Sequence, residues 1–449
     1  MISAFIGIVR ALFWRSAIMA ALCSAGVAGL PSRAESQPLP GAETVYASAP
    51  PRLLQIRTLV ADAGRQTSTG SGFLVSADGL AITNYHVVSD AALEPKTYRL
   101  EYTGADGTQG AVALLAVDLP NDLALVRVEK QNAPFFGFDK AALDGSLPKG
   151  ERLYSLGNPL DLGFTIIEGT YNGLVEHSYN DHIHFTGALN PGMSGGPAVN
   201  AQGQVVGVNV ATRRGGQLIS FLVPARFAAA LVARGQDAKP APADLRKDVI
   251  AQLVSWRGAL YKSLGEEGFR DRVFGSYQAP ETRAAWFECW ASTNASASPK
   301  PRASINSTSC KAEASVYVAS DLNTGAVEVS HAYAKSIDLN QFQFATVLTQ
   351  LAQPRLTLGG SFRKWYTPQH CNEDFVGMAP AAAEHPPLRV IWCAQGYREF
   401  DGLYDVAMVA VTQDHADEAL VSRLSLQAIA YDDALQLGKS FLERLQAVR

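Results

Sequence analysis

The sequence predicts two consecutive β-barrels followed by a separate α+β domain. Three observations lead to this prediction. From Leu53 to Gly235, short runs of alternating apolar residues are separated by turn sequences, which is typical of a sandwich or barrel. The polar motifs of this region fall into two halves, with a boundary expected at 138–150. Beyond residue 247, the pattern changes to a long helix, several strands and a final helix.

The glycine-rich stretch around Ser194 is the most informative part of the chain. It reads Gly-Met-Ser-Gly-Gly-Pro over residues 192–197. A serine hydroxyl is a poor nucleophile, so Ser194 needs a general base and donors for a developing oxyanion. Because the glycines let the backbone turn tightly, the amides of Gly192, Met193 and Ser194 can point at one spot. The pattern predicts a serine nucleophile beside an oxyanion hole.

A histidine and an aspartate upstream can activate this serine. His86 ends an apolar run that follows Gly-Ser-Gly at 70–72, and Asp122 opens the apolar run Leu123–Val128. Asp118 competes with Asp122, which is favoured because it directly precedes the strand. Taken alone, each residue also fits a core or turn position. The order His, Asp, Ser is that of the chymotrypsin-like double barrel, not of subtilisin or the α/β-hydrolases.

The same serine also fits the G-x-S-x-G elbow of α/β-hydrolases. That elbow requires a helix directly after the serine and its Asp and His partners downstream. Here Ser194 is followed by two glycines, Pro197 and an alternating run, Val199–Val210, which predicts a hairpin through Gln202-Gly203. The context therefore argues against the hydrolase elbow.

Five motifs carry a resemblance to a known family. GSGFLVSADGLAITNYHVV, PNDLALVRV, YSLGNPLDLGFTIIEGTYNGL, ALNPGMSGGPAVNAQGQVVGVN and ISFLVPA follow one another as in the trypsin-like serine proteases of the HtrA (Deg) family. The resemblance covers residues 53–232. It implies a serine endopeptidase with protein or peptide substrates and no cofactor. It makes His86 the general base, Asp122 its orienting carboxylate, Ser194 the nucleophile and Gly192 to Ser194 the oxyanion hole.

The resemblance also suggests how substrate is held. Ala188 stands six residues before Ser194, where a trypsin-type pocket carries an aspartate, so we expect small to medium apolar P1 residues. The backbone of Asn209, Val210 and Ala211 is expected to pair with the substrate as an added strand. The stretch 212–217 either flanks the pocket or is a solvated hairpin loop. Met193 departs from the Asn that is common at this place in the family.

The N-terminal region has the features of an export signal. Residues 1–34 begin with a segment that carries Arg10 and Arg15, followed by a short apolar core and by Ser-Arg-Ala before an expected cleavage after Ala34. A membrane anchor is the alternative, and Cys23 invites a lipoprotein hypothesis that the bulky Leu22 disfavours. We expect a periplasmic or secreted protein with no stable membrane anchor after cleavage. Residues 35–52, rich in Pro, Ala and Ser, predict a flexible lead-in.

The composition excludes some classes of binding partner but does not by itself assign a function. The 449 residues are 47% hydrophobic and 18% charged with a formal charge of −4, so nothing suggests nucleic acid as a partner. The oligomeric state stays open. His177, His182 and His184 form a cluster that predicts either a polar strand near the cleft or a metal pair without a third ligand. No metal site is therefore expected.

The last part of the chain belongs to no family that the sequence identifies. A linker is predicted over 236–246 and an α+β domain over 247–449, where HtrA proteins would usually carry PDZ domains. A helix is expected at 248–269 and again at 432–447. Strands are expected at 286–290, 312–319, 326–334, 342–351, 388–394 and 404–411.

Four cysteines fall in this last part and suggest its covalent framework. They are Cys289, Cys310, Cys371 and Cys393, and in an exported chain an even number favours two disulfides. Sequence allows three connectivities, of which the local one, Cys289 with Cys310 and Cys371 with Cys393, is favoured. An alternative function is a resting or scaffold protein whose C-terminal domain binds a partner. A further possibility is that this domain blocks the cleft and is itself the substrate.

Overall fold

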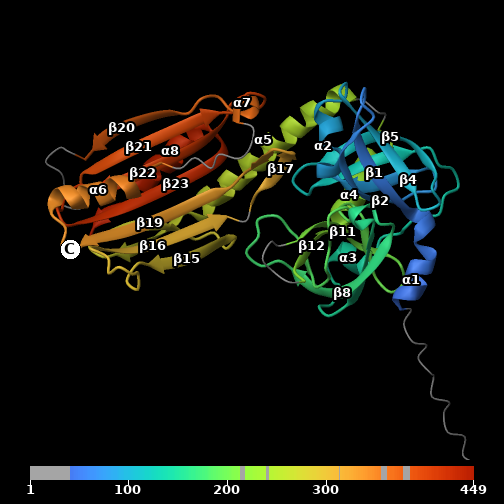
Figure 1. The fold of residues 1–449 in the computed structure, drawn as a ribbon, viewed down its shortest axis with the longest axis horizontal. Helices are drawn as coiled ribbons and strands as arrows, with labels where there is room; N and C mark the ends of the chain where they lie inside the picture. The colour runs from blue at the N-terminus through green and yellow to red at the C-terminus, as the bar shows by residue number, and fades with distance from the viewer. Residues whose placement is uncertain are drawn as a thin grey trace, which may run out of the picture. The chain divides into compact units, whose positions relative to one another are not determined.

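The alternating runs between Leu53 and Val128 close into a first β-barrel (Figure 1). The structure is a computed structural model and describes residues 41–212, 218–238, 242–312, 314–354, 362–377 and 385–448. The strands are hydrogen-bonded in the order β1-β2-β3-β6-β5-β4. Their bounds are β1 (Leu53–Val60), β2 (Gln66–Leu74), β3 (Leu80–Asn84), β4 (Tyr98–Gly104), β5 (Gln109–Asp118) and β6 (Leu123–Val128). Helix α2 (Tyr85–Leu93) follows β3 directly.

A second barrel follows after the short helix α3 (Lys140–Asp144), which lies in the boundary region predicted between the barrels. Its closed order is β10-β11-β12-β9-β8-β7. The strands are β7 (Arg152–Gly157), β8 (Thr165–Leu174), β9 (Ile183–Phe185), β10 (Pro197–Val199), β11 (Val205–Thr212) and β12 (Ser220–Pro224), with the short helix η2 (Pro159–Asp161) after β7. Helix α4 (Ala225–Gly235) then packs on the first barrel, where Gly235 lies against Ala116 and Leu125.

The lead-in differs from its prediction. Within 35–52, expected to be flexible, the structure has helix α1 (Ala42–Ser48) and the helical turn η1 (Pro50–Arg52). Val45 and Ala49 are buried, and the Tyr46 hydroxyl donates a 2.6 Å hydrogen bond to the Phe164 carbonyl on the second barrel. Burial of these apolar side chains orders a segment whose composition alone indicated a loop. The predicted signal segment and Cys23 lie outside the described residues.

The C-terminal domain is built on a seven-stranded antiparallel sheet in the order β15-β16-β19-β23-β22-β21-β20. Its strands are β15 (Phe287–Thr293), β16 (Ala303–Ala312), β19 (Val327–Ser336), β20 (His370–Val376), β21 (Leu388–Gly396), β22 (Leu403–Thr412) and β23 (Glu418–Ala430). Smaller sheets pair β13 (Phe269–Phe274), β14 (Tyr277–Thr282) and β24 (Gln446–Ala447), and separately β17 (Val316–Ala319) and β18 (Leu322–Thr324).

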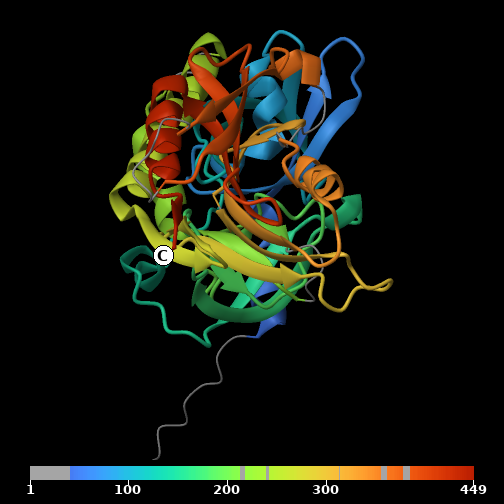
Figure 2. The same ribbon diagram turned by 90° about the vertical axis from the view of Figure 1, so that its left-hand side faces the viewer.

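Helices cover both faces of the large sheet (Figure 2). Along β22, Ala407, Val409 and Val411 face a core that includes Phe344 of α6 (Gln341–Leu351). Val406 and Met408 face the other core, with Phe441 of α8 (Tyr431–Leu442). The remaining helices are α5 (Pro242–Glu267), which begins inside the predicted linker, and α7 (Phe362–Trp365).

The strand predicted at 342–351 is wrong, because these residues form helix α6. Asn340 accepts a hydrogen bond from the Gln343 amide, and the Gln343 side chain accepts one from the Asn340 amide. This capping box satisfies two backbone donors that a helix start leaves unpaired. Phe344 then packs on the sheet.

One disulfide at each edge of the large sheet joins the edge strand to its neighbour. Cys289 of β15 bonds Cys310 of β16, and Cys371 of β20 bonds Cys393 of β21. These are the two local pairs favoured by the sequence. An edge strand is bonded on one side only, so a covalent cross-link holds it in register.

The first barrel and the C-terminal domain share one hydrophobic core cluster. Leu253 and Trp256 of α5 belong to the same cluster as Tyr85 and Val88 of α2, and Val318 of β17 joins them. Helix α2, which carries His86, is therefore packed from both sides. No helix in the described ranges is long and apolar enough to cross a membrane.

Candidate active site

His86 and Asp122 meet because β3 and β6 are paired. Asn84, the last residue of β3, lies opposite Leu123, the first of β6, so the residues beyond these strand ends are neighbours. His86 Nδ1 lies 2.6 Å from Asp122 Oδ2, and the His86 amide donates a 2.8 Å hydrogen bond to Oδ1. A carboxylate accepts only, so the ring proton is on Nδ1 and Nε2 is free to accept one.

The turn that carries Asp122 is held by several hydrogen bonds. Asp122 has a φ of 51°, a left-handed conformation that aspartate tolerates better than most residues. Its carbonyl accepts bonds from the Asn84 side chain and the Tyr85 amide. From α5, the Gln252 side chain accepts from the Leu119 amide at 2.8 Å and donates to the Val117 carbonyl at 2.9 Å. The C-terminal domain thus fixes the base of this turn.

Asp118, the competing carboxylate, bonds to Asn121 and makes no contact with His86 among the described hydrogen bonds.

The electrostatics of His86 follow from its partner Asp122. Burial lowers the pKa of His86. The charge of Asp122 and the hydrogen bond to it raise the pKa by more than burial lowers it, so the pKa lies above its ordinary value. The imidazole side chain is 27% exposed.

The loop before Ser194 presents two amides. The Pro191 carbonyl accepts a 3.0 Å bond from the Leu160 amide, and since the peptide is planar, the Gly192 N–H points the opposite way. Gly192 has a φ of 94°, which glycine adopts readily. Within the described part of the chain, the amides of Gly192 and Ser194 have no hydrogen-bond partner. The Met193 amide donates to the Asn190 carbonyl at 3.1 Å.

Buried polar side chains hold this loop against the barrels. Ser71 Oγ donates to the Gly192 carbonyl at 2.7 Å and accepts from the Asn158 amide at 2.9 Å. The Ser71 amide bonds the Ser194 carbonyl. Asn209 Nδ2 donates to the carbonyls of Leu156 and Met193. Sequence reasoning missed Ser71, although its place in Gly-Ser-Gly was the available signal.

The Ser194 hydroxyl donates a 3.3 Å hydrogen bond to the Val210 carbonyl. It makes none to His86 among the described contacts, so transfer of its proton to the imidazole would require the hydroxyl to turn first. Hydrogen bonds between a serine nucleophile and its histidine are often long or poorly aligned before substrate binds.

Two of the predicted substrate-binding residues, Asn209 and Val210, contact the serine loop, while Ala211 pairs with Phe221 of β12. Val210 is a bulge residue of β11: its neighbours Asn209 and Ala211 pair with β12, but Val210 itself does not. Asn209 already uses both backbone groups, with Gly195 and Gly196. Ala188 lies exposed on the loop after β9. The loop at 213–217 lies outside the described residues.

We expect replacement of Ser71 by alanine to weaken catalysis with the fold intact. The change leaves the Gly192 carbonyl and the Asn158 amide without their buried partner, at a cost of about 1–3 kcal/mol. The freed loop can then turn an amide away, and loss of one oxyanion donor typically lowers kcat by about 100-fold or more. Steady-state kcat and thermal unfolding would be compared with those of Ser146→Ala, an exposed serine just after α3. Unchanged kcat would contradict the expectation.

The histidine cluster does not assemble. His177 Nδ1 contacts the Ala285 carbonyl at 2.6 Å, and the His182 ring packs on Phe221. Among described residues, the one group of possible ligands close enough for a metal is Glu281 with Cys289 and Cys310, whose sulfurs form a disulfide.

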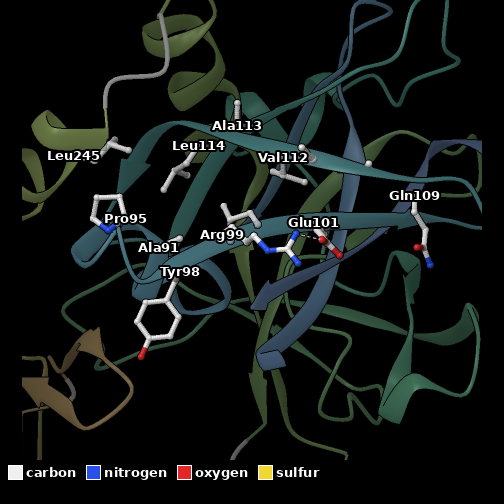
Figure 3. A pocket seen from close by; sticks show the side chains of 13 residues that line it. Ala91, Pro95, Tyr98, Arg99, Glu101, Gln109, Val112, Ala113, Leu114 and Leu245 are labelled. Carbon is white, nitrogen blue, oxygen red and sulfur yellow. Dashed lines mark hydrogen bonds and ion pairs between the residues drawn. The ribbon is translucent and has the colours of Figure 1, made fainter. Parts of the chain in front are cut away.

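A cavity of about 550 Å³ lies away from this site, against β4 and β5 of the first barrel (Figure 3). Its lining includes Tyr98, the Arg99–Glu101 ion pair and Leu245 at the start of α5. Neither His86 nor Ser194 lines it, so this cavity takes no part in chemistry at the serine.

Comparison with known proteins decides what this arrangement belongs to. The family model described as a trypsin-like peptidase domain matches residues 70–208. This part of the chain is a trypsin-like peptidase domain. Curated relatives include a probable periplasmic serine endoprotease DegP-like of Chlamydia muridarum, 35% identical over 172 residues, covering 36% of this chain and 33% of the relative. The putative serine protease HhoB of Synechocystis is also 35% identical, with 36% and 39% covered.

The chain thus spans about a third of the length of these relatives. Similar solved structures include a serine endoprotease from Yersinia pestis, with 21% identity and a TM-score of 0.37, covering 45% of this chain and 66% of that one. A protease of M. tuberculosis in its active form has 22% identity and a TM-score of 0.39, covering 44% and 86%. The family match covers β3 to β10 with parts of β2 and β11, and it ends at residue 208, before the C-terminal domain begins.

Proposed function

We propose that the chain is an exported serine endopeptidase that uses His86, Asp122 and Ser194. The observation that carries the proposal is the doubly bonded His86–Asp122 pair beside a serine loop whose two free amides have no partner in the described ranges. The peptidase domain and the serine protease names of its relatives support it. The relatives named periplasmic support export of this chain.

The mechanism follows from these groups. Ser194 Oγ attacks the peptide carbonyl carbon while His86 Nε2 takes its proton, and the amides of Gly192 and Ser194 stabilise the oxyanion. Asp122 orients the imidazole and stabilises its charged form. Collapse of the intermediate breaks the C–N bond as His86 protonates the leaving amine. The acyl group is now an ester of Ser194. Water attacks this ester with the same help from His86 and the two amides, which releases the carboxylic acid and restores the serine. The Met193 amide, engaged by Asn190, helps hold the loop.

Substrate preference and export are part of the proposal. Ala188 provides no carboxylate, so small to medium apolar P1 residues are expected, because an unpaired buried cation is costly. Removal of residues 1–34 on export would place Glu35 at the N-terminus, and sequencing of the exported protein checks this.

The decisive experiment labels the full chain with a fluorophosphonate probe and incubates it with unfolded casein. Ser194→Ala is the inactive variant, and Ser146→Ala, at an exposed turn after α3, is the matched control. We expect labelling and cleavage by the wild type and by Ser146→Ala only. If a folded wild type gave neither labelling nor cleavage, the proposal would be overturned.

The bond from Ser194 to Val210 favours a second candidate. In it, the peptidase domain rests with its serine turned away and the C-terminal domain binds a partner. Weak labelling that rises only when a partner protein is added would favour this resting state over constitutive activity.

A further inference from the structure

The hairpin of β17 and β18 places a tyrosine against the proposed general base. The ring of Tyr317 stands edge-on to the His86 imidazole, with 5.8 Å between centroids and 66° between planes. It also packs edge-on against Tyr85, and its hydroxyl lies 3.5 Å from Ser89 Oγ. Residues of α2 therefore surround this ring on the side away from the C-terminal domain.

The hairpin that carries this ring is packed in place by contacts on both of its strands. The buried Tyr85 hydroxyl donates a 2.9 Å bond to the Val318 carbonyl. Val316 and Val318, on either side of Tyr317, are 2% and 0% exposed and belong to the core shared with α2. Thr324 at the end of β18 bonds the Tyr397 hydroxyl of the C-terminal domain.

A cavity of about 260 Å³ lies beside Val210 and reaches the same segment, although Ser194 itself does not line it. Val210, whose carbonyl holds the Ser194 hydroxyl, lines it together with Phe221 and His182. Ser315, two residues before Tyr317, and Glu288 line it from the C-terminal domain. A peptide laid along Val210 would therefore run between the peptidase domain and the C-terminal domain.

Side chains of an extended peptide alternate between two sides. With the P1 side chain assigned to the Ala188 side, the side chain of the preceding residue, P2, is assigned to the opposite side, toward His86. We propose that Tyr317 is a specificity-determining residue that forms, with His86, the wall facing P2 and admits only small P2 side chains. This inference rests on the proposed peptidase function and assigns the C-terminal domain a part in substrate selection.

The test compares kcat/KM of the full-length protein for two peptides that differ only at P2, alanine against phenylalanine. Wild type should favour alanine. Tyr317→Ala removes the ring, and we expect the preference to fall about tenfold or more, the range of discrimination set by steric fit in a pocket. Tyr317→Phe keeps the ring and should keep the preference. Phe342→Ala, at an 87% exposed aromatic on α6, is the matched control and should not change it.

Labelling by the fluorophosphonate probe and thermal unfolding show whether each variant keeps its serine site and fold. An Ala/Phe ratio in Tyr317→Ala equal to that of wild type would overturn the inference and leave the proposed function standing. An equal change in Phe342→Ala would also overturn it. A wild type that neither labels nor cleaves would overturn the proposed function, and this inference with it.

Discussion

Replacing Asp122 by asparagine should lower kcat/KM about 10⁴-fold, the loss that such a change causes in serine peptidases of this type. Asp122 accepts a bond from His86 Nδ1 at 2.6 Å and from the His86 amide at 2.8 Å. A carboxamide can keep the amide bond with its oxygen, but its NH₂ group then faces Nδ1. This favours the tautomer protonated on Nε2, which cannot take the Ser194 proton.

The pH profile separates this effect from simple misfolding. Peptide hydrolysis needs neutral His86, so in wild type kcat/KM should rise with pH through the raised pKa of that imidazole. Without the charge of Asp122, the rising limb should move to lower pH. The control is Asp118→Asn, since Asp118 bonds Asn121 instead of His86. An equal loss in both variants would count against the role of Asp122.

Replacing Leu253 by alanine should lower the free energy of unfolding by about 2–5 kcal/mol, the range for a buried leucine. Leu253 is 0% exposed on α5 and lies in the core that α5 shares with α2 and the first barrel. Because that core is continuous, the peptidase domain should lose stability together with the C-terminal domain. Denaturant unfolding followed by tryptophan fluorescence and by fluorophosphonate labelling should give coincident transitions.

The matched control on the same helix is Lys262→Ala. Its side chain is 75% exposed and forms only a surface pair with Glu266, so we expect a change within about 0.5 kcal/mol. Labelling that survives to the wild-type denaturant midpoint in Leu253→Ala would mean that the two domains unfold independently.

Local pattern predicted the elements whose surroundings are simple. A barrel strand with one buried face alternates in sequence, and a tight loop near a nucleophile needs glycine, so both features can be found without a structure. The central strand β23 was not predicted. Its residues are buried on both faces over most of 418–430, which leaves no alternation to detect. Segment 342–351 has the aromatic and β-branched residues of a strand, but a capping box and packing of Phe344 make it a helix.

The two-barrel domain and the candidates His86, Asp122 and Ser194 could be predicted from local motifs, because each residue stands in a short motif with its own chemistry. The contacts that hold these residues became apparent only from the packing of distant segments. Ser71 under the serine loop, Gln252 under the aspartate turn and Tyr317 beside the histidine act across long sequence separations. No local pattern encodes such contacts, because they depend on how α5 and the β17–β18 hairpin pack against α2.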